Sequence, residues 1–152
     1  MVVETKYWGS FEVKEDKVVM FVEDLAGFAG FREFALIPIP QHSPFICLQA
    51  INNPEVGFVI VDPWQFISDY SPVISDNDAQ SLDLNSPSDA LLFTLVTADS
   101  GADNKLSLNL LAPLVININS GKAKQVVLEN SNYSTNSSIC FPEGSSKQLA
   151  SA

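Results

Sequence analysis

The chain has 152 residues, of which 46% are hydrophobic and 17% charged, a composition that excludes a disordered chain and fits one folded domain. Eighteen Asp and Glu against eight Lys and Arg give a net charge of −10, which argues against binding to nucleic-acid phosphates or anionic membranes. The longest apolar runs, residues 90–96 and 110–118, fall short of the roughly 20 residues that span a bilayer.

The acidic residues are concentrated in one part of the chain. Residues 33–104 contain no Lys or Arg. That segment holds ten acids: Glu33, Glu55, Asp62, Asp69, Asp76, Asp78, Asp83, Asp89, Asp99 and Asp103. Such segregation favours a basic protein partner. The alternative, that an acidic surface only keeps the protein soluble, stays open from charge alone.

Up to residue 61 the sequence predicts five strands, because alternating or apolar runs are separated by turn-forming residues. The predicted strands are residues 7–13, 18–22, 34–39, 45–51 and 57–61. The first two strands are expected to form a hairpin around the polar turn at residues 14–17. Between the second and third strands, Gly27 and Gly30 suit a tight turn.

The middle of the chain predicts a short helix and a buried strand. The helix is expected over residues 76–84, with Asp76 or Asp78 as its cap and Ala79 and Leu82 among its spaced apolar residues. Residues 90–98 are nearly continuously apolar and rich in β-branched side chains. They predict a strand that is buried on both faces.

The last third predicts three shorter strands, at residues 106–108, 114–118 and 125–128, after a polar loop at 99–105. Many short strands about ten residues apart predict an all-β fold: a compact β-barrel-like or sandwich single domain with one short helix. We expect this β domain to span residues 1–141, with 139–141 docked on the core. Residues 142–152, rich in Ser and Gly, are expected to form a flexible tail.

Residue types that support catalysis are scarce. His42 is the only histidine, and its neighbours are typical of a loop. The chain has neither the ligand spacing of a metal site nor the nucleophile elbow of a serine hydrolase. The sequence therefore predicts that the protein is not an enzyme and holds no metal and no cofactor. A hydrolase that uses His42 together with an acidic residue is a further alternative.

The two cysteines, Cys47 and Cys140, are expected to be free thiols, because the start of the chain lacks the pattern of an export signal. A disulfide between them is the alternative. The lack of an export-signal pattern also predicts a cytoplasmic location.

Short motifs along residues 3–134 occur in a characteristic order and spacing. They are Thr5-Lys6-Tyr7, Leu25-Ala26-Gly27-Phe28, Ser43-Pro44-Phe45, Leu48-Gln49-Ala50, residues 58–63, 109–117 and 124–128, and Tyr133. Together they resemble the FliW family of flagellar assembly factors. Asp24 and Ala50 depart from the family's usual Gly and Ser.

The resemblance implies a cytoplasmic, non-catalytic protein that binds flagellin and the RNA-binding translational repressor CsrA. FliW occupied by flagellin leaves CsrA free to repress flagellin translation, and FliW released from flagellin binds CsrA and relieves the repression. We expect a monomer without a direct nucleic-acid or membrane partner. The main alternative is a small-ligand-binding β-barrel.

The charge pattern adds candidate contacts to this expectation. We expect acids to face the basic repressor, with these leading candidates: Glu55, Asp62, Asp69, Asp76 and Asp78. Flagellin is expected to place an apolar helix or an extended segment on a site lined by aromatics such as Trp8 or Trp64. The motif residues are expected to be turn and core elements: Gly27, Phe28, Pro44, Phe45, Leu48, Gln49, Pro63, Asn109, Pro113 and Asn117.

Overall fold

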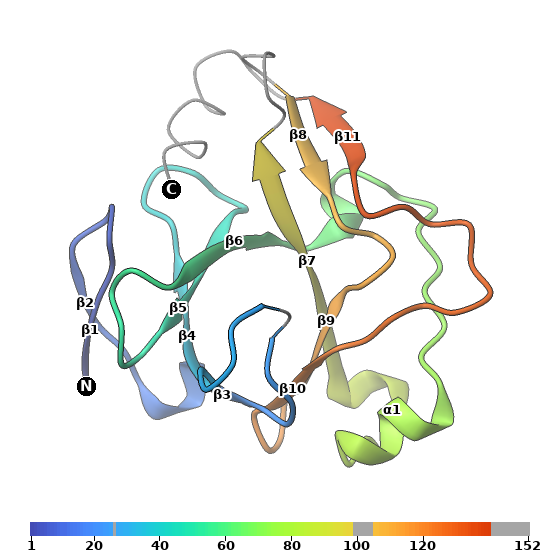
Figure 1. The fold of residues 1–152 in the computed structure, drawn as a ribbon, viewed down its shortest axis with the longest axis horizontal. Coiled ribbons are helices and arrows are strands. Elements are labelled where there is room, and N and C mark those ends of the chain that lie inside the picture. Colours follow the sequence, from blue (N-terminus) through green and yellow to red (C-terminus); the bar gives the residue numbers. More distant parts are fainter. Residues whose placement is uncertain (26, 99–104, 141–152) are drawn as a thin grey trace.

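The computed structural model describes residues 1–25, 27–98 and 105–140 (Figure 1). Its strands are β1 Val2–Glu4, β2 Ser10–Glu12, β3 Val18–Phe21, β4 Glu33–Pro38, β5 Ile46–Ala50, β6 Gly57–Val61, β7 Ala90–Ala98, β8 Lys105–Leu108, β9 Leu114–Asn117, β10 Lys122–Gln125 and β11 Ser137–Cys140. The helical elements are α1 Asp76–Ser81 and three single 3-10 turns: η1 Glu15–Lys17, η2 Pro63–Gln65 and η3 Pro87–Asp89. The loop at 99–104 and the tail expected at 142–152 lie outside the described residues.

Seven strands close into a barrel. The hydrogen-bonded order β7-β6-β5-β4-β3-β10-β9 returns to its start, because β9 also pairs with the first half of β7. β7 can pair with three strands because it has nine residues: Ala90–Phe93 pair with β9, and Thr94–Val96 pair with β6. Its last residues pair with β8, which continues to β11 outside the ring. The barrel-like form of the all-β prediction is therefore the one the chain adopts.

The inside of the ring is filled with side chains. Alternate residues of the barrel strands point inward, as the two-residue period of a strand requires, and include Phe21, Phe34, Leu48, Ile60 and Leu114. Each of these five is at most 1% exposed. The rings of Phe21 and Phe34 meet edge to face at 5.4 Å between centroids, a favoured aromatic geometry.

The other alternate set points outward and forms a second core under elements that lie against the barrel. Ala35, Cys47, Val59 and Val115 belong to it. It is covered by Val3 and Val13 of the N-terminal segment, by Tyr70 and Leu82 from the segment around α1, and by Leu106, Leu108 and Ile139 from β8 and β11. The barrel thus has two cores, one inside and one outside its wall.

Several predicted elements are confirmed, with the edges shifted by a residue or two. β4, β5, β8 and β9 fall on their predicted segments, and β6 and β7 match the predicted bounds. The short helix is present over Asp76–Ser81. Of the segment 139–141 that is predicted to dock, Ile139 is buried, and residue 141 lies outside the described residues.

The predicted N-terminal hairpin is wrong. β2 pairs with β1, not with β3, and β3 pairs with β4 and, in parallel, with β10. The polar residues at 14–17 form η1 and carry the chain from the outer hairpin into the barrel. Local polarity identified the turn, but the partner of β3 is set by barrel closure across about a hundred residues of sequence.

Three further predictions need correction. The cap of α1 is Ser75, whose hydroxyl accepts from the Asp78 N–H at 3.1 Å, and not Asp76 or Asp78. β7 is not buried on both faces, since Thr94 alone among its residues is fully buried. The last barrel strand lies at Lys122–Gln125, earlier than predicted, because the more hydrophobic stretch that follows it covers the outer core with Val126 and Leu128.

Candidate partner-binding groove

An apolar groove of about 700 Å³ opens on the surface beside α1. Its lining comes entirely from residues 64–92, within the segment that lacks Lys and Arg. The main apolar contributors are Trp64, Tyr70, Val73, Ile74, Leu84 and Leu92. The groove is open to solvent, and Val73 is 82% exposed and Trp64 42%. Exposed large apolar side chains in one concave place are typical of a binding site.

The aromatic wall of the groove is held by specific hydrogen bonds. Asp62 follows β6 and caps η2, with its carboxylate accepting from the Trp64 N–H at 2.9 Å. The indole of Trp64 donates to the Tyr70 carbonyl at 2.9 Å, and the Tyr70 hydroxyl donates to the Leu110 carbonyl at 2.7 Å. Burial raises the pKa of Tyr70 well above its usual range, so this hydroxyl keeps its proton. The wall is therefore set in place before any partner arrives.

Tyr133 supports the same wall from a distant part of the sequence. Its ring meets Tyr70 edge to face at 4.8 Å, and its hydroxyl accepts from the Ser71 N–H at 2.8 Å. Trp64 lies 5.6 Å from Tyr70 between ring centroids. The sequence offered Trp64, beside Trp8, as a candidate aromatic for a flagellin site, and Trp64 lines this groove. It did not point to Tyr70, Val73 or Ile74, because no local pattern marks an exposed groove.

Helix α1 contributes Ala79 to the groove and is fixed to the barrel at both ends. Near its start, Asp78 accepts from the Lys124 ammonium of β10 at 2.7 Å, and the two side chains are only 18% and 13% exposed. After its end, the buried Asn117 amide donates to the carbonyls of Leu82 and Asp83 at 2.8 and 3.2 Å. The Asn117 side-chain oxygen accepts from the N–H of Asn119 at 2.8 Å, so one side chain holds both segments.

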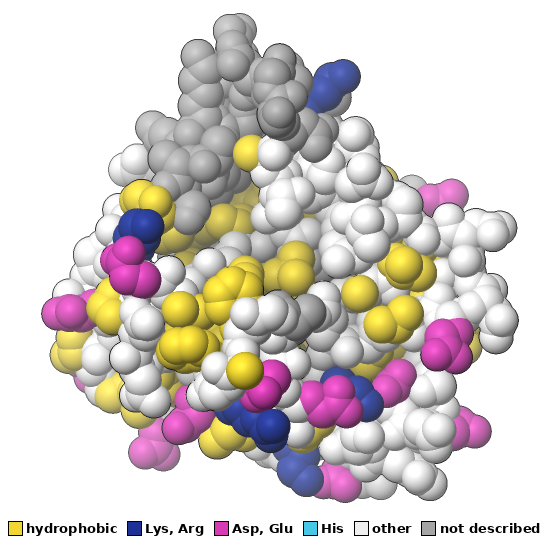
Figure 2. All heavy atoms as spheres, in the orientation of Figure 1, with side chains coloured by type: hydrophobic (Ala, Val, Ile, Leu, Met, Phe, Trp, Pro, Cys, Tyr) yellow, Lys and Arg dark blue, Asp and Glu magenta, His cyan; other side chains and the backbone are white. Residues whose placement is uncertain are grey.

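The five candidate acids do not lie together. Asp69, Asp76 and Asp78 lie within residues 64–92, which line the groove, Asp62 lies just before them, and Glu55 lies in the β5–β6 turn. In Figure 1 this turn is at the left of the view and α1 at the lower right. Asp62 is engaged in capping and Asp78 with Lys124, whereas Asp69 and Asp76 are exposed and form no ion pair with a described residue. The right-hand edge of Figure 2, over α1 and the segment before it, shows acidic side chains without Lys or Arg.

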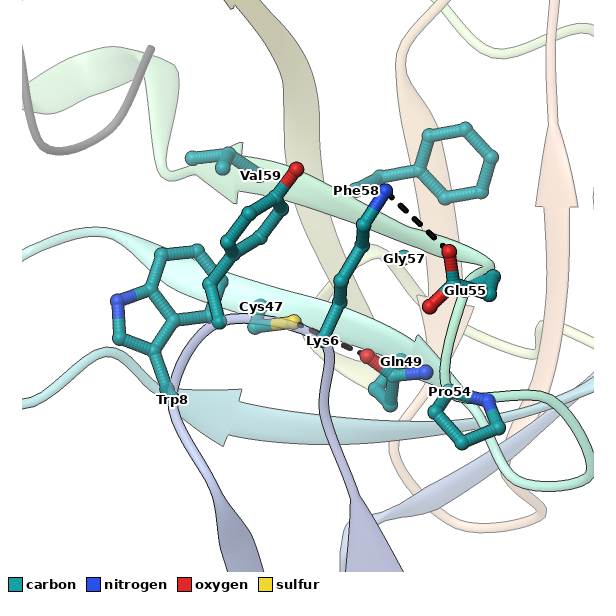
Figure 3. A pocket seen from close by; sticks show the side chains of 10 residues that line it. Lys6, Trp8, Cys47, Gln49, Pro54, Glu55, Gly57, Phe58 and Val59 are labelled. Carbon is teal, nitrogen blue, oxygen red and sulfur yellow. Dashed lines mark hydrogen bonds and ion pairs between the residues drawn. The ribbon is translucent and has the colours of Figure 1, made fainter. Parts of the chain in front are cut away.

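Glu55 belongs to a different surface feature. It forms an ion pair with Lys6 at 3.3 Å, and the Lys6 ammonium lies 5.3 Å from the centroid of the Tyr7 ring (Figure 3). Hydrogen bonding to Tyr7, and then to Glu55, raises the pKa of Lys6. The space under this pair is only about 30 Å³, room for about one water. Trp8, the other candidate aromatic, borders this small pocket and is half-buried.

Behind that pocket, the buried Gln49 amide organises the β5–β6 turn. Its nitrogen donates to the carbonyls of Asn53 and Val56, each at 3.0 Å, and to Ala50 at 3.1 Å. Its oxygen receives a long 3.8 Å contact from the Cys47 thiol (Figure 3). Cys47 is a free cysteine, and burial raises the pKa of its thiol to about 12. The side chain of Cys140 lies outside the described residues.

The other motif residues lie in turns and cores. Gly27 has a positive φ of 80°, which suits glycine, and Phe28 after it stacks edge to face on Phe58 at 4.9 Å. Leu48, Phe45 and Pro63 are buried, and Pro44 follows Ser43 through a cis peptide bond. The Asn109 side chain accepts from the Ala112 N–H at 3.0 Å, and the carbonyl of buried Pro113 accepts from Val126. His42 is half-buried in the turn before β5.

A second groove of about 440 Å³ lies against β4, β5 and β7. Leu36, Ile46, Leu91 and Phe93 line it from the barrel, with Lys14 and Lys17 among the residues on the opposite side. Among the described residues, no group of three or more His, Cys, Asp and Glu is placed to hold a metal ion. Within the same ranges no helix has the length and hydropathy to span a bilayer.

The geometry matches a known family over nearly its whole length. A family model described as FliW protein matches residues 2–139. A flagellar assembly factor FliW from Pseudothermotoga lettingae is 40% identical over 134 residues, covering 88% of this chain and 85% of that protein. The one from Geobacillus sp. (strain WCH70) is 36% identical over 143 residues, covering 94% and 97%.

Relatives and a solved structure agree on the fold. The flagellar assembly factor FliW of Bacillus subtilis (strain 168) is 33% identical over 135 residues, covering 89% of this chain and 94% of that protein. A crystal structure of the flagellar assembly factor FliW superposes with a TM-score of 0.81 at 34% identity, covering 93% of this chain and 98% of that one. The family model and these relatives each cover most of the chain, so the chain belongs to the FliW family.

Proposed function

We propose that this protein is a cytoplasmic, non-catalytic flagellar assembly factor that binds flagellin and the translational repressor CsrA. The observation that carries the proposal is family membership over residues 2–139, together with relatives that bear the name flagellar assembly factor. The two partners are those that the FliW resemblance implies.

The proposed mechanism is a partner switch. Flagellin occupies the protein while flagellin is abundant, and CsrA stays free to repress flagellin translation. When flagellin is exported, the protein is released, binds CsrA and relieves the repression. In this scheme a monomer with two alternative partners senses the free flagellin pool and needs no cofactor.

Two physical features support binding as the protein's activity. The groove beside α1 exposes Trp64 and Val73, which gives a partner apolar surface to cover. The segment that forms the groove has only negative charges, which favours a basic protein such as an RNA-binding repressor. Acids on a bound partner also repel RNA phosphates near the repressor, without any need to cover its RNA site.

The interior of the barrel favours this proposal over the small-ligand alternative. A ligand-binding barrel needs interior space for an apolar molecule. Here the ring is filled by the large side chains Phe21, Phe34, Leu48, Ile60 and Leu114. The groove beside α1 opens on the outer surface, where a protein segment has access, whereas the second groove is lined by Leu36, Ile46 and Phe93, which pack against the inner core.

Titration calorimetry with purified CsrA at two salt concentrations tests the repressor half of the proposal. We expect binding by the wild-type chain that weakens as salt rises, and weaker binding with a shallower salt slope for the double variant Asp69→Lys, Asp76→Lys. The double variant Glu15→Lys, Asp16→Lys, on exposed η1, is the matched charge control. Absence of wild-type binding, or unchanged affinity and salt slope in the double variant, would overturn this half.

Titration with purified flagellin monomer tests the other half. We expect a one-to-one complex with the wild-type chain, and an equal affinity for His42→Ala, because a binder does not use that imidazole in chemistry. No complex with the wild-type chain would remove flagellin as a partner. Loss of function through His42→Ala, with the fold intact, would instead favour the hydrolase alternative.

A further inference from the structure

We propose that the groove beside α1, lined by Trp64, Tyr70, Val73, Ile74, Leu84 and Leu92, binds an α-helical partner segment whose apolar face is flanked by Lys or Arg. The inference rests on the proposed function in one respect: flagellin is the partner taken to supply this helix. It assigns the apolar groove to flagellin and not to the repressor.

The apolar exposure is concentrated where a helix can cover it. Val73 is 82% exposed and Trp64 42%, and both line the same groove. Ile74, Leu84 and Leu92 add further apolar lining and are partly buried. A face of this composition matches the stripe of side chains that an amphipathic helix presents at three- and four-residue spacing.

The groove is preformed, which reduces the ordering that binding requires. The aromatic wall is held by the bonds from Trp64 to Tyr70 and from Tyr70 to Leu110, and α1 contributes to another part of the lining. Helix α1 is itself fixed by the Lys124–Asp78 ion pair and by Asn117. Both parts are thus tied to the barrel or to the segments packed on it.

The side-chain lining of the groove favours a helix over an extended segment. An extended segment needs partners for its own backbone N–H and C=O groups along its length, and the lining takes only Ala90 and Leu92 from a strand. The polar residues of the lining are few, namely Ser71, Asn85 and Ser86. A helix satisfies its backbone internally and needs only apolar contact from the groove.

The charges near the groove favour basic flanks on that helix. Asp69 and Asp76 adjoin the lining in sequence, are exposed and have no ion-pair partner among the described residues. The two lysines of β10 are engaged, Lys122 with Asp83 and Lys124 with both Asp78 and Glu23. A Lys or Arg on the partner therefore meets uncompensated carboxylates here.

The first experiment measures the affinity of flagellin for groove variants. Val73→Arg places a charged chain on the most exposed apolar position, and Val2→Arg, on 66% exposed Val2 of the outer hairpin, is its matched control. We expect Val73→Arg to weaken flagellin binding roughly tenfold or more, as for a central apolar contact, and Val2→Arg to leave it unchanged. Because Val73 is on the surface, circular dichroism should show the same fold in both.

The outcomes separate the inference from the proposed function. Flagellin binding that is normal in Val73→Arg overturns the groove assignment and leaves flagellin as a partner. Loss of CsrA binding in Val73→Arg, with flagellin binding retained, also overturns it, because the groove then serves the repressor. Weakened flagellin binding with CsrA binding retained supports it.

A second experiment measures peptide binding to the groove in the absence of flagellin. Synthetic peptides of about 18 residues, long enough for five turns, are added to the Trp8→Phe variant, and fluorescence of the remaining Trp64 is followed. We expect saturable binding of a helix with a Leu face and Lys flanks, and weaker binding when Glu replaces Lys. The inference would be overturned if a peptide of the same composition, reordered so that apolar and polar residues alternate as in a strand, bound to the protein. It would also be overturned if the Lys-flanked helix gave no response. Both results would count even if flagellin proves not to be a partner.

Discussion

At the scale of single residues, buried polar side chains within the sequence motifs hold the fold together through hydrogen bonds. Gln49 was expected to be a structural residue from its place in a motif, but the sequence did not reveal what it bonds. Its amide nitrogen holds the carbonyls of Asn53 and Val56 across the β5–β6 turn. That role depends on where the turn folds back, which no local pattern specifies.

Replacing Gln49 should destabilise the protein. Gln49→Leu removes the donor from carbonyls that the protein shields, so the free energy of unfolding should fall by about 1–3 kcal/mol. Urea denaturation of the variant, compared with Gln65→Leu at an exposed position, measures it. Equal stability of the two variants would show that water satisfies the turn as well as Gln49 does.

Gly57 tests the same arrangement from the facing strand. A methyl group built at Gly57 would approach the Gln49 side-chain oxygen to 2.9 Å, closer than an ordinary contact. Gly57→Ala should therefore displace the Gln49 amide and lower stability by about 1–3 kcal/mol, as overpacking does. In a Gln49→Leu background the two losses should not add, since they act on one contact. Additive losses would contradict the proposed contact.

At the scale of elements, the sequence predicted strands better than it predicted their partners. Strand positions follow from local alternation and turn residues, and most were confirmed. Pairing depends on closure of the ring, so the hairpin predicted for residues 7–13 and 18–22 was wrong. β1 carries no strong local signal, and β10 is too polar, at Lys122–Gln125, to be recognised as a barrel strand.

Helix α1 has only six residues and depends on the barrel for its stability. Lys124→Met leaves Asp78 without its cation, so amide hydrogen exchange in α1 should speed up and the free energy of unfolding should fall by roughly 1–3 kcal/mol. Lys122→Met, on the same strand, is the control, because the Lys122–Asp83 pair is more exposed. An unchanged exchange rate in Lys124→Met would show that Asn117 alone holds the helix.

The same ion pair predicts a pH dependence. The hydrogen bond to Asp78 is the largest of the effects that raise the pKa of Lys124 above its ordinary value of 10.5. The folded protein therefore holds this proton more tightly than the unfolded chain. The stabilisation is complete below pH 10.5 and is lost as pH rises through the folded-state pKa. Stability curves of wild type and Lys124→Met should converge at alkaline pH, and a constant gap would contradict the assignment.

At the scale of the whole molecule, composition and charge favoured protein binding, and the ordered motifs indicated the family. The expected acidic surface is divided by the fold: Glu55 lies at the β5–β6 turn with Lys6, and the other four candidates lie on the groove segment or just before it. Trp64 lines that groove, whereas Trp8 lies at the small pocket beside Glu55. A linear charge pattern does not specify which acids share a face.

The partner switch is the central claim for the whole molecule, and a competition experiment tests it most directly. Labelled CsrA is bound to the purified chain, and flagellin monomer is added while fluorescence anisotropy reports the bound fraction. We expect flagellin to release CsrA stoichiometrically and removal of flagellin to restore the complex. A stable ternary complex, or CsrA that stays bound at saturating flagellin, would contradict it.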